Sequence, residues 1–449
     1  MRTAIRSHWL FILLLIVLSS FYIWGVVKVP FHPDESTYIF MSADFERIVT
    51  NPLSMVWDAE YPLTDGFRYR LIDAPLARYL LGIGRALTGL PAPAVDWDWS
   101  ASWEANQSSG ALPNARMLLI ERLTIASLFP LCLLLLYLIG LKLGRRLMGI
   151  AAILLFSLHP LILLHTRRAM AEGVLMFGVI LTLYAFTRAD KHPLLVGLAV
   201  AVAFNAKHSA ILLLPIGLIA VCWLPNSTTR KFSRTLINLT GYLIGFILLT
   251  ALLNPVIWRN PYAATKEALI QRQNLLNRQL ADIKRISPTQ VLETPAERAA
   301  VTLAQLFITP PIFSEVGNYR LQTTKAEFEY LSTPGNNFWR NSLSAGITLG
   351  FTLLGIIAAF RVSSSGNFNQ RRILILFLLS FLVMVMGIIL MIPLAWQRYS
   401  VPLIPFVSIF ASLGWVWGIK NSRRIFSHGR LSSRLSQILA QFTPDSWMP

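Results

Sequence analysis

The feature that most constrains this chain is a series of apolar runs, each long enough to cross a lipid bilayer. A helix needs roughly 17–25 apolar residues to do so. Hydrophobic residues make up 54% of the chain and charged residues only 14%, whereas soluble domains carry about 25% charged residues. We therefore predict an all-α integral membrane protein with about ten transmembrane helices, at 9–27, 123–141, 147–165, 172–187, 193–206, 209–224, 236–254, 342–360, 373–392 and 400–418.

The net charge of +18 would suit a nucleic-acid-binding protein, but the positions of the basic residues indicate membrane topology instead. With the N-terminus in the cytoplasm, every short cytoplasmic connection is basic, as the positive-inside rule requires. No small-x-small cleavage site precedes Lys28, so we expect the first span to be an uncleaved anchor. The predicted cytoplasmic cations are Arg2, Arg6, Lys142, Arg145, Arg146, Arg188, Lys191, Arg230, Lys231, Arg234, Arg361, Arg371, Arg372, Lys420, Arg423, Arg424, Arg430 and Arg434.

Two long hydrophilic segments, 28–122 and 255–341, face the non-cytoplasmic side in this topology. Transporters usually keep their chemistry at the bilayer midplane, whereas here the polar residues are gathered at one face. We predict that residues 1–449 form a single multi-spanning domain with an outer-facing site. The tail, 419–449, is basic and predicted to be cytoplasmic, in a multi-pass protein of the cell membrane.

Both outer loops contain segments whose apolar residues recur at steps of three and four, as in an amphipathic helix. These are Pro75–Leu90 and Lys266–Arg285, with basic residues beside each apolar stripe. We predict interfacial helices in the headgroup layer, with packing on the loops' own core as the alternative. The tryptophans of 91–113 are interpreted as interface anchors, with sugar stacking as the alternative.

An acidic pair, Asp34 and Glu35, follows the first span. Carboxylates at a membrane mouth are expensive unless they are solvated, paired or used. Adjacent carboxylates also repel, which raises one pKa and favours a base that works near neutral pH. The alternative is structural, with Asp34 capping a helix that begins at Glu35.

Positive charge at the outer face is against the positive-inside bias, so it calls for an explanation. A single such residue is usually a snorkelling side chain, or a salt-bridge partner for Glu172 or Asp34. Several at one membrane level favour an anion-binding site. The residues are Arg122, Arg167, Arg168, Lys207 and Arg398, each predicted near the outer end of a span.

Glycosyl transfer from a lipid-linked sugar phosphate is chemistry that needs both kinds of residue. Cations stabilise the charge that develops on the leaving phosphate. A carboxylate takes the proton of the acceptor hydroxyl, which is otherwise a poor nucleophile. The isoprenoid tail of the donor would lie along the helices.

The chain resembles the C-type, multi-spanning, polyprenyl-phosphate-dependent glycosyltransferases. It is most similar to their protein O-mannosyltransferase and aminoarabinose-transferase-like branch (glycosyltransferase family 39-like). The resemblance is carried by eight short stretches of the sequence, through their order and spacing. Residues 260–340 match nothing in the family. The stretches are Pro33–Tyr38, Asp73–Leu76, Arg122–Leu123, Gly144–Arg146, Arg168–Glu172, Ala206–Ala210, Asn254–Trp258 and Trp396–Tyr399.

This resemblance implies a sugar transferred from a polyprenyl-phosphate carrier to a hydroxyl on a cell-envelope lipid, glycan or protein, with inversion. It implies Asp34 as the catalytic base, Glu35 as an orienting residue and Glu172 as an acid near the sugar. It also implies a donor phosphate bound by Arg122, Arg168, Lys207 and Arg398. The second outer loop shows no extra lumenal domain, which makes transfer to protein less secure than transfer to a lipid or glycan.

Three other functions are alternatives: a transporter or flippase for lipid-linked sugars, a non-catalytic assembly partner, and a polymerase or ligase that uses diphosphate-linked donors. His32 with Asp34 and Glu35 does not make a convincing closed metal site, so no metal or other cofactor is expected to be required. Cys132 and Cys222 both lie in apolar runs and are interpreted as small hydrophobic residues.

Overall fold

The computed structural model describes residues 2–144, 146–223, 232–313, 317–338, 340–365 and 368–427. Within these ranges the secondary structure is helical, and the only strand-like feature is an isolated bridge between Val291 and Leu394. The all-helical prediction is therefore confirmed. Five predicted cytoplasmic cations lie outside the described residues, namely Arg145, Arg230, Lys231, Arg430 and Arg434.

Six helical stretches in the described part of the chain are long and apolar enough to cross a membrane: His8–Lys28, Ala115–Leu143, Phe232–Leu253, Ser342–Arg361, Phe368–Met391 and Gln397–Asn421. Four shorter apolar helices accompany them, Arg146–Ser157, Ala171–Phe186, Pro193–Ala206 and His208–Cys222. All ten predicted spans overlap one of these stretches. The multi-spanning character is confirmed, and the number of ten stays a prediction.

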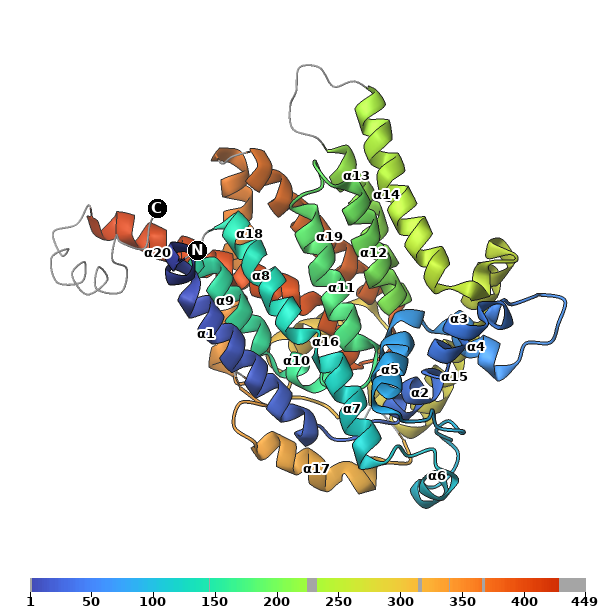
Figure 1. Cartoon of the computed structure of the whole chain (residues 1–449). Coiled ribbons are helices and arrows are strands. Elements are labelled where there is room, and N and C mark those ends of the chain that lie inside the picture. The colour runs from blue at the N-terminus through green and yellow to red at the C-terminus, as the bar shows by residue number, and fades with distance from the viewer. Residues whose placement is uncertain are drawn as a thin grey trace.

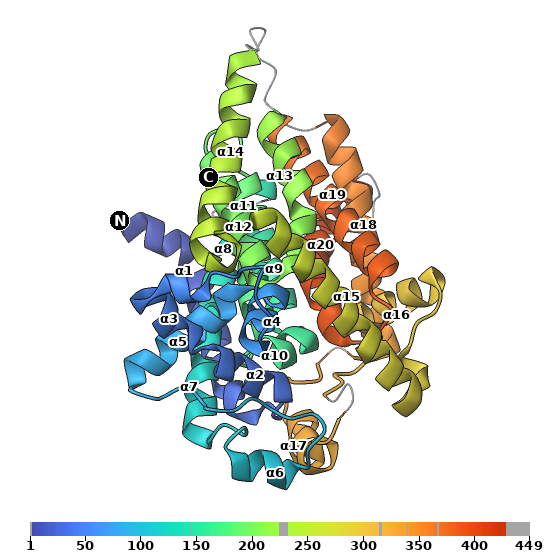
Figure 2. The same ribbon diagram turned by 90° about the vertical axis from the view of Figure 1, so that its right-hand side faces the viewer.

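The apolar helices lie side by side as a bundle (Figures 1 and 2). The bundle helices are α1 (Arg2–Trp24), α7 (Ala115–Ala126), α8 (Phe129–Leu143), α9 (Arg146–Ser157), α10 (Pro160–His165), α11 (Ala171–Phe186), α12 (Pro193–Ala206), α13 (Leu213–Cys222), α14 (Phe232–Leu253), α18 (Ser342–Ser365), α19 (Phe368–Met391) and α20 (Ile404–Ser427). The predicted span 147–165 divides into α9 and α10, because Pro160 has no backbone N–H to continue the helix and the His159 side chain caps the new start.

The two hydrophilic segments form an outer layer at one end of the bundle, opposite the free end of α14 (Figures 1 and 2). The first segment contributes α2 (Pro33–Met41), α3 (Asp44–Thr50), α4 (Asp65–Ile72), α5 (Pro75–Thr88) and α6 (Trp103–Ser109). The second contributes α15 (Pro261–Ile286), α16 (Pro295–Phe307) and α17 (Arg320–Ser332).

In the outer layer the arginines of α5 are buried and ion-paired. Arg78 contacts Asp44, which also accepts two hydrogen bonds from Arg70, and Arg85 binds both oxygens of Glu46. Arg78 and Arg85 are therefore not available to lipid phosphates, so α5 follows the alternative of packing on the loop's own core. Burial alone would raise the pKa of Asp44, but the guanidinium groups of Arg70 and Arg78 hold that pKa below its usual value.

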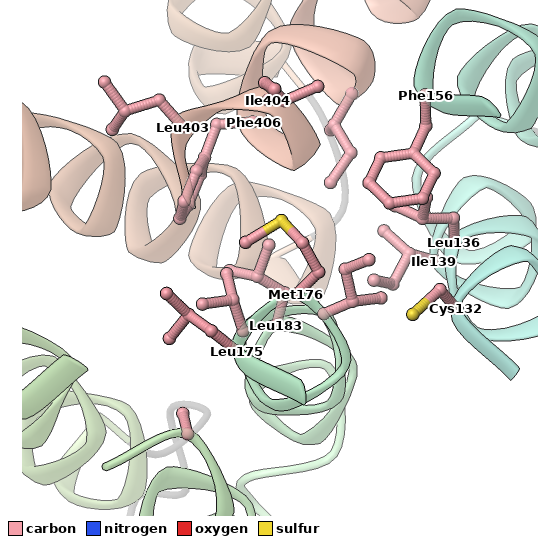
Figure 3. Close-up of a cluster of buried hydrophobic side chains, with 14 of the residues drawn as sticks. Cys132, Leu136, Ile139, Phe156, Leu175, Met176, Leu183, Leu403, Ile404 and Phe406 are labelled. Carbon is pink, nitrogen blue, oxygen red and sulfur yellow. The ribbon is translucent and has the colours of Figure 1, made fainter. Parts of the chain in front are cut away.

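One continuous hydrophobic core fills the bundle. Side chains of α8, α9, α11 and the start of α20 meet at its centre (Figure 3). Cys132 is buried in this cluster and unbonded, as expected for a small hydrophobic residue.

Glycines allow α18 and α20 to cross at backbone contact. A Cβ added at Gly355 would lie 1.8 Å from the Phe410 carbonyl oxygen, and one at Gly414 would lie 2.0 Å from that of Phe351. Small residues at such crossings let helices in a membrane approach closely enough for van der Waals contact to hold them. At Gly346, which lies nine residues before Gly355 in α18, an added Cβ would meet nothing within 4 Å.

We expect Gly355→Ala to destabilise the protein, because the new methyl group must push the α18 and α20 backbones apart. Overpacking of this kind costs about 1–3 kcal/mol. Thermal unfolding of the purified protein in detergent would measure it, with Gly346→Ala as the matched control. Equal melting temperatures for the two variants would contradict the close crossing.

Candidate active site

The acidic motif forms the start of α2, and its local structure separates the roles of its two carboxylates. His32 is the N-cap, Pro33 occupies the first helical turn, and the His32 ring Nδ1 accepts a hydrogen bond from the Asp34 backbone N–H at 3.1 Å. The Glu35 side chain accepts one from the His32 backbone N–H at 3.1 Å, which completes a capping box. The cap is thus built by His32 and Glu35, and the Asp34 carboxylate takes no part in it.

The His32 ring is held neutral. Burial, together with the guanidinium groups of Arg168 and Arg398, keeps the pKa of His32 well below its usual value. A neutral ring has one unprotonated nitrogen, and the hydrogen bond from Asp34 N–H assigns that acceptor role to Nδ1. His32 therefore acts here as a helix cap.

Glu35 forms a fully buried ion pair with Arg122. Arg122 Nε and Nη2 each donate to one Glu35 carboxylate oxygen at 2.7 Å, and Nη1 donates to the carbonyls of Val26 and Val29 at 3.2 and 2.7 Å. Ala169 N–H donates to Glu35 at 2.9 Å. Four of the five Arg122 donors are therefore occupied. The pair joins the end of the first span, α2, α7 and the turn before α11.

Asp34 forms an ion pair with Arg398, which lies in a short 3-10 turn, Gln397–Tyr399. Both side chains reach solvent, with 23% and 13% of their surfaces exposed. The Arg398 guanidinium lies over the Trp396 ring at 4.6 Å and near the Tyr399 ring at 5.9 Å. These aromatic faces fix the cation beside the carboxylate.

A second ion pair lies next to the first. Lys207 Nζ donates to Glu172 Oε1 at 2.8 Å, with Glu172 buried and Lys207 22% exposed. Lys207 also lies 5.6 Å from the Tyr399 ring. Tyr399 thus separates two cations, Lys207 and Arg398, each paired with a carboxylate and each open to solvent on one side.

The two adjacent arginines before α11 differ. Arg167 is fully buried, donates to the carbonyls of Tyr22 and Phe21 and to Asn336, and lies over the rings of Phe21 and Tyr22. Arg168 makes one long hydrogen bond, 3.3 Å from Nη2 to the Phe313 carbonyl, and its buried Nε has no partner among the described residues. Of the two arginines, Arg168 therefore has more N–H groups that could bond to a ligand.

The structure therefore brings all seven predicted site residues into one connected region. Glu35 with Arg122 forms its buried part. Asp34 with Arg398 and Glu172 with Lys207 form its open part, and Arg168 borders His32. The roles assigned to these seven residues stay predictions.

Two further carboxylates border the site and were not among the predicted residues. Burial raises the pKa of Asp73, and the nearby Asp34 charge adds to the effect. Asp96 accepts hydrogen bonds from Tyr69 and from Trp97 N–H, and burial raises its pKa as well. Asp73 lay in a stretch that carried the family resemblance, whereas nothing in the local sequence singles out Asp96.

The second outer loop holds the Arg398 segment in place. Gln305 donates to the Ala395 carbonyl at 2.7 Å and accepts from the Ser400 hydroxyl at 2.6 Å. Gln397 accepts from Ile312 N–H at 2.8 Å and donates to the Pro310 carbonyl at 2.7 Å. The loop without any recognisable motif thus fixes the turn that carries Arg398.

No group of three or more histidine, cysteine, aspartate or glutamate side chains capable of holding a metal occurs in the described ranges. The independence of any metal stays a prediction.

Comparison with known proteins agrees with the motifs. Residues 48–254 match the family model of dolichyl-phosphate-mannose-protein mannosyltransferases. This match confirms the predicted resemblance and supports a membrane glycosyltransferase. Asp34, Glu35 and Arg398 lie outside the matched range. No curated protein matches the chain.

Solved structures with a similar arrangement include three membrane proteins. The Saccharomyces cerevisiae protein O-mannosyltransferase Pmt1–Pmt2 complex is 16% identical, with 56% of this chain and 34% of that one covered and a TM-score of 0.39. ArnT from Cupriavidus metallidurans, bound to undecaprenyl phosphate, is 13% identical, with 95% of this chain and 65% of that one covered and a TM-score of 0.48. The Archaeoglobus fulgidus oligosaccharyltransferase AglB is 11% identical, with 99% of this chain and 55% of that one covered and a TM-score of 0.47. This chain spans about a third to two thirds of these proteins' lengths.

We expect Glu35→Gln to destabilise the fold, because it leaves the Arg122 charge buried without a counter-charge. Breaking a buried pair in this way costs about 3–5 kcal/mol. Thermal unfolding would measure the loss. Asp65→Asn is the control, since Asp65 is 80% exposed in its pair with Arg68 and such pairs contribute about 0–1 kcal/mol. Similar melting of both variants would show that the Glu35–Arg122 pair is not structural.

Proposed function

We propose that this chain, which resembles the C-type polyprenyl-phosphate-dependent glycosyltransferases of the protein O-mannosyltransferase branch, transfers a sugar from a polyprenyl-phosphate carrier to a hydroxyl acceptor. The acceptor is an envelope lipid, glycan or protein, and the reaction takes place on the non-cytoplasmic face of the cell membrane. The observation that carries the proposal is the solvent-open Asp34–Arg398 pair at the outer end of the bundle, with Lys207 beside it.

In this proposal Arg398 and Lys207 bind the donor phosphate. Both are held by aromatic rings and each already faces a carboxylate. An entering donor phosphodiester, with one negative charge and two non-bridging oxygens, would share the two cations with those carboxylates. The second charge, which develops on the phosphate as the sugar leaves, would then strengthen its hold on the cations. Arg168, whose Nε has no hydrogen-bond partner in the described part of the chain, is the third candidate.

The same exchange would activate the base. While Arg398 is paired with Asp34, the guanidinium occupies a carboxylate oxygen that would take the proton. Once Arg398 turns to phosphate, that oxygen is released to the acceptor hydroxyl, and this happens only when donor is present. This order would limit wasteful hydrolysis of the donor.

The proposed chemical step is a single displacement. The acceptor hydroxyl gives its proton to Asp34, and its oxygen forms a bond to the anomeric carbon. The bond from that carbon to the phosphate oxygen breaks on the opposite side, and the electron pair stays on the phosphate, which the cations stabilise. Attack opposite the leaving group inverts the anomeric configuration.

Glu172 serves in this proposal to orient Lys207 next to the sugar, because it is buried and bonded to that cation. Glu35 and Arg122 act as positioning residues. With four Arg122 donors bound to protein groups, we propose that Arg122 aligns α2 with the bundle and thereby places Asp34, in preference to a direct phosphate contact.

We expect Asp34→Asn to abolish transfer, since the amide cannot accept the acceptor's proton. A positioned general base contributes about 10²–10⁴-fold in rate. The measurement is single-turnover release of sugar from radiolabelled polyprenyl-phosphate sugars, with purified protein and cell-envelope acceptors. Asp65→Asn serves as the exposed-carboxylate control.

Full activity of Asp34→Asn would exclude Asp34 as the base. If the wild type released no sugar from any donor, while vesicles containing it moved the lipid-linked sugar across the bilayer, the transporter alternative would replace the transferase.

Arg398→Ala and Lys207→Ala should chiefly weaken donor binding. Each removes a charge-assisted hydrogen bond worth about 1.5–3 kcal/mol, equivalent to roughly 10–100-fold in donor affinity. Donor titrations of initial rate would report this as a raised KM, with the exposed Arg68→Ala as control. An unchanged KM and kcat in Arg398→Ala would remove Arg398 from the phosphate site.

A further inference from the structure

A pocket of about 430 Å³ opens in the outer layer, apart from the Asp34–Arg398 pair. It lies between the connection from α3 to α4, the first turn of α4, and the segment that follows α14; these elements lie together at one side of the outer layer (Figures 1 and 2). Its volume falls in the range of small-ligand sites, about 300–1,000 Å³. Its lining includes Val56, Trp57, Asp58, Tyr61, Phe67 and Arg259.

The pocket is built on packed structure. Trp57 is only 7% exposed and packs with Leu71, Val256 and Ala264 in a small hydrophobic core that joins the two outer loops. Asp58 fixes the loop that follows, because its Oδ1 accepts a hydrogen bond from Glu60 N–H at 3.1 Å. The wall that carries Trp57 is therefore held from both loops.

Within this wall the indole N–H of Trp57 is buried and has no hydrogen-bond partner among the described residues. Buried tryptophan N–H groups usually find an acceptor, and leaving a buried donor unsatisfied costs about 1–3 kcal/mol. Trp57 lines the pocket, so a small rotation of its indole ring on ligand binding would bring this N–H to an oxygen of the bound molecule.

The charges at the pocket cancel. Asp58 Oδ2 and Arg259 Nη1 lie 2.5 Å apart, with Arg259 57% and Asp58 14% exposed. A phosphate or a free amine would meet no net opposite charge here. A neutral molecule rich in hydroxyl groups could instead donate to the carboxylate and accept from the guanidinium.

We propose that this pocket binds a saccharide. A sugar ring has an apolar C–H face and a rim of hydroxyl groups. The aromatic side chains of Tyr61 and Phe67 can cover the apolar face. Tyr61 is 70% exposed, so its ring is available to a ligand, and Trp57 N–H with the Asp58–Arg259 pair supplies donors and acceptors for the rim.

Helix α4 connects this pocket with the transfer site. Phe67 lies in its first turn, and Asp73 follows its last residue. Eight helical residues span about 12 Å at 1.5 Å each. An acceptor glycan of more than one unit could therefore keep an inner sugar in the pocket while its terminal hydroxyl reaches Asp34. This acceptor role rests on the proposed function, whereas saccharide binding does not.

The test is equilibrium binding of four disaccharides, maltose, cellobiose, mannobiose and diacetylchitobiose, to the full chain in lipid nanodiscs, where no sugar-bearing detergent competes. We expect saturable binding of at least one by calorimetry. Trp57→Phe keeps the aromatic ring and removes the N–H, so affinity should fall roughly fivefold, as for one hydrogen bond. Trp258→Phe is the control, because its N–H already bonds to the Ala251 carbonyl.

No binding of any disaccharide, equal affinity in wild type and Trp57→Phe, or equal loss in both tryptophan variants would overturn the saccharide pocket. Displacement of the sugar by glycerol phosphate would also overturn it, in favour of a lipid headgroup site. Asp34→Asn should bind the disaccharide as the wild type does. If the wild type bound it but transferred no sugar from any donor, the proposed function would fail and the pocket would stand.

Discussion

The buried Glu35–Arg122 ion pair is the interaction on which the rest of the site depends. Taking two charges out of water is expensive, and a buried pair is tolerated only when its remaining donors and acceptors are bonded. Here the backbone provides those bonds, through the carbonyls of Val26 and Val29 and the N–H groups of His32 and Ala169. One pair therefore ties together four chain segments, and Asp34, the neighbour of Glu35, is placed at the bundle mouth by this framework.

The open part of the site follows a different principle. Arg398 and Lys207 lie at the end of the bundle that carries the hydrophilic segments (Figure 1), and each is paired with a carboxylate. A partly buried charge without a partner would be costly, so the pairing stabilises this region. The same pairing means that an anion gains affinity only by displacing a carboxylate. In the proposed function, the donor phosphate would therefore enter by competing with the carboxylates for these cations.

That the seven candidate residues lie close together could be predicted from the sequence, because charges near apolar runs are rare enough to be informative. The pairing of the acids with the bases, and hence the part that each residue plays, could not be predicted. Glu35 and Arg122 lie 87 residues apart, Asp34 and Arg398 364 apart, and no local pattern says which acid meets which base. Helical periodicity likewise located α5 but left open where its arginines point, since their partners Asp44 and Glu46 belong to another helix. Gln305 and Gln397 carry no signal at all, because an amide that bonds to a distant backbone looks like any other polar residue.

That last case explains why the second outer loop is large although it contains no recognisable motif. The segment that carries Arg398 has few hydrogen bonds of its own, being two short 3-10 turns between α19 and α20. Bonds from Gln305 and Gln397, and the pairing of Leu292 N–H with the Pro393 carbonyl, instead hold the backbone of this segment in place. In the proposed function, that support would keep the Arg398 backbone fixed while its guanidinium exchanges Asp34 for phosphate. Support of the Arg398 segment is thus one role of this loop, and it is a role that hydrogen bonds to backbone groups can fill without a recognisable chemical motif.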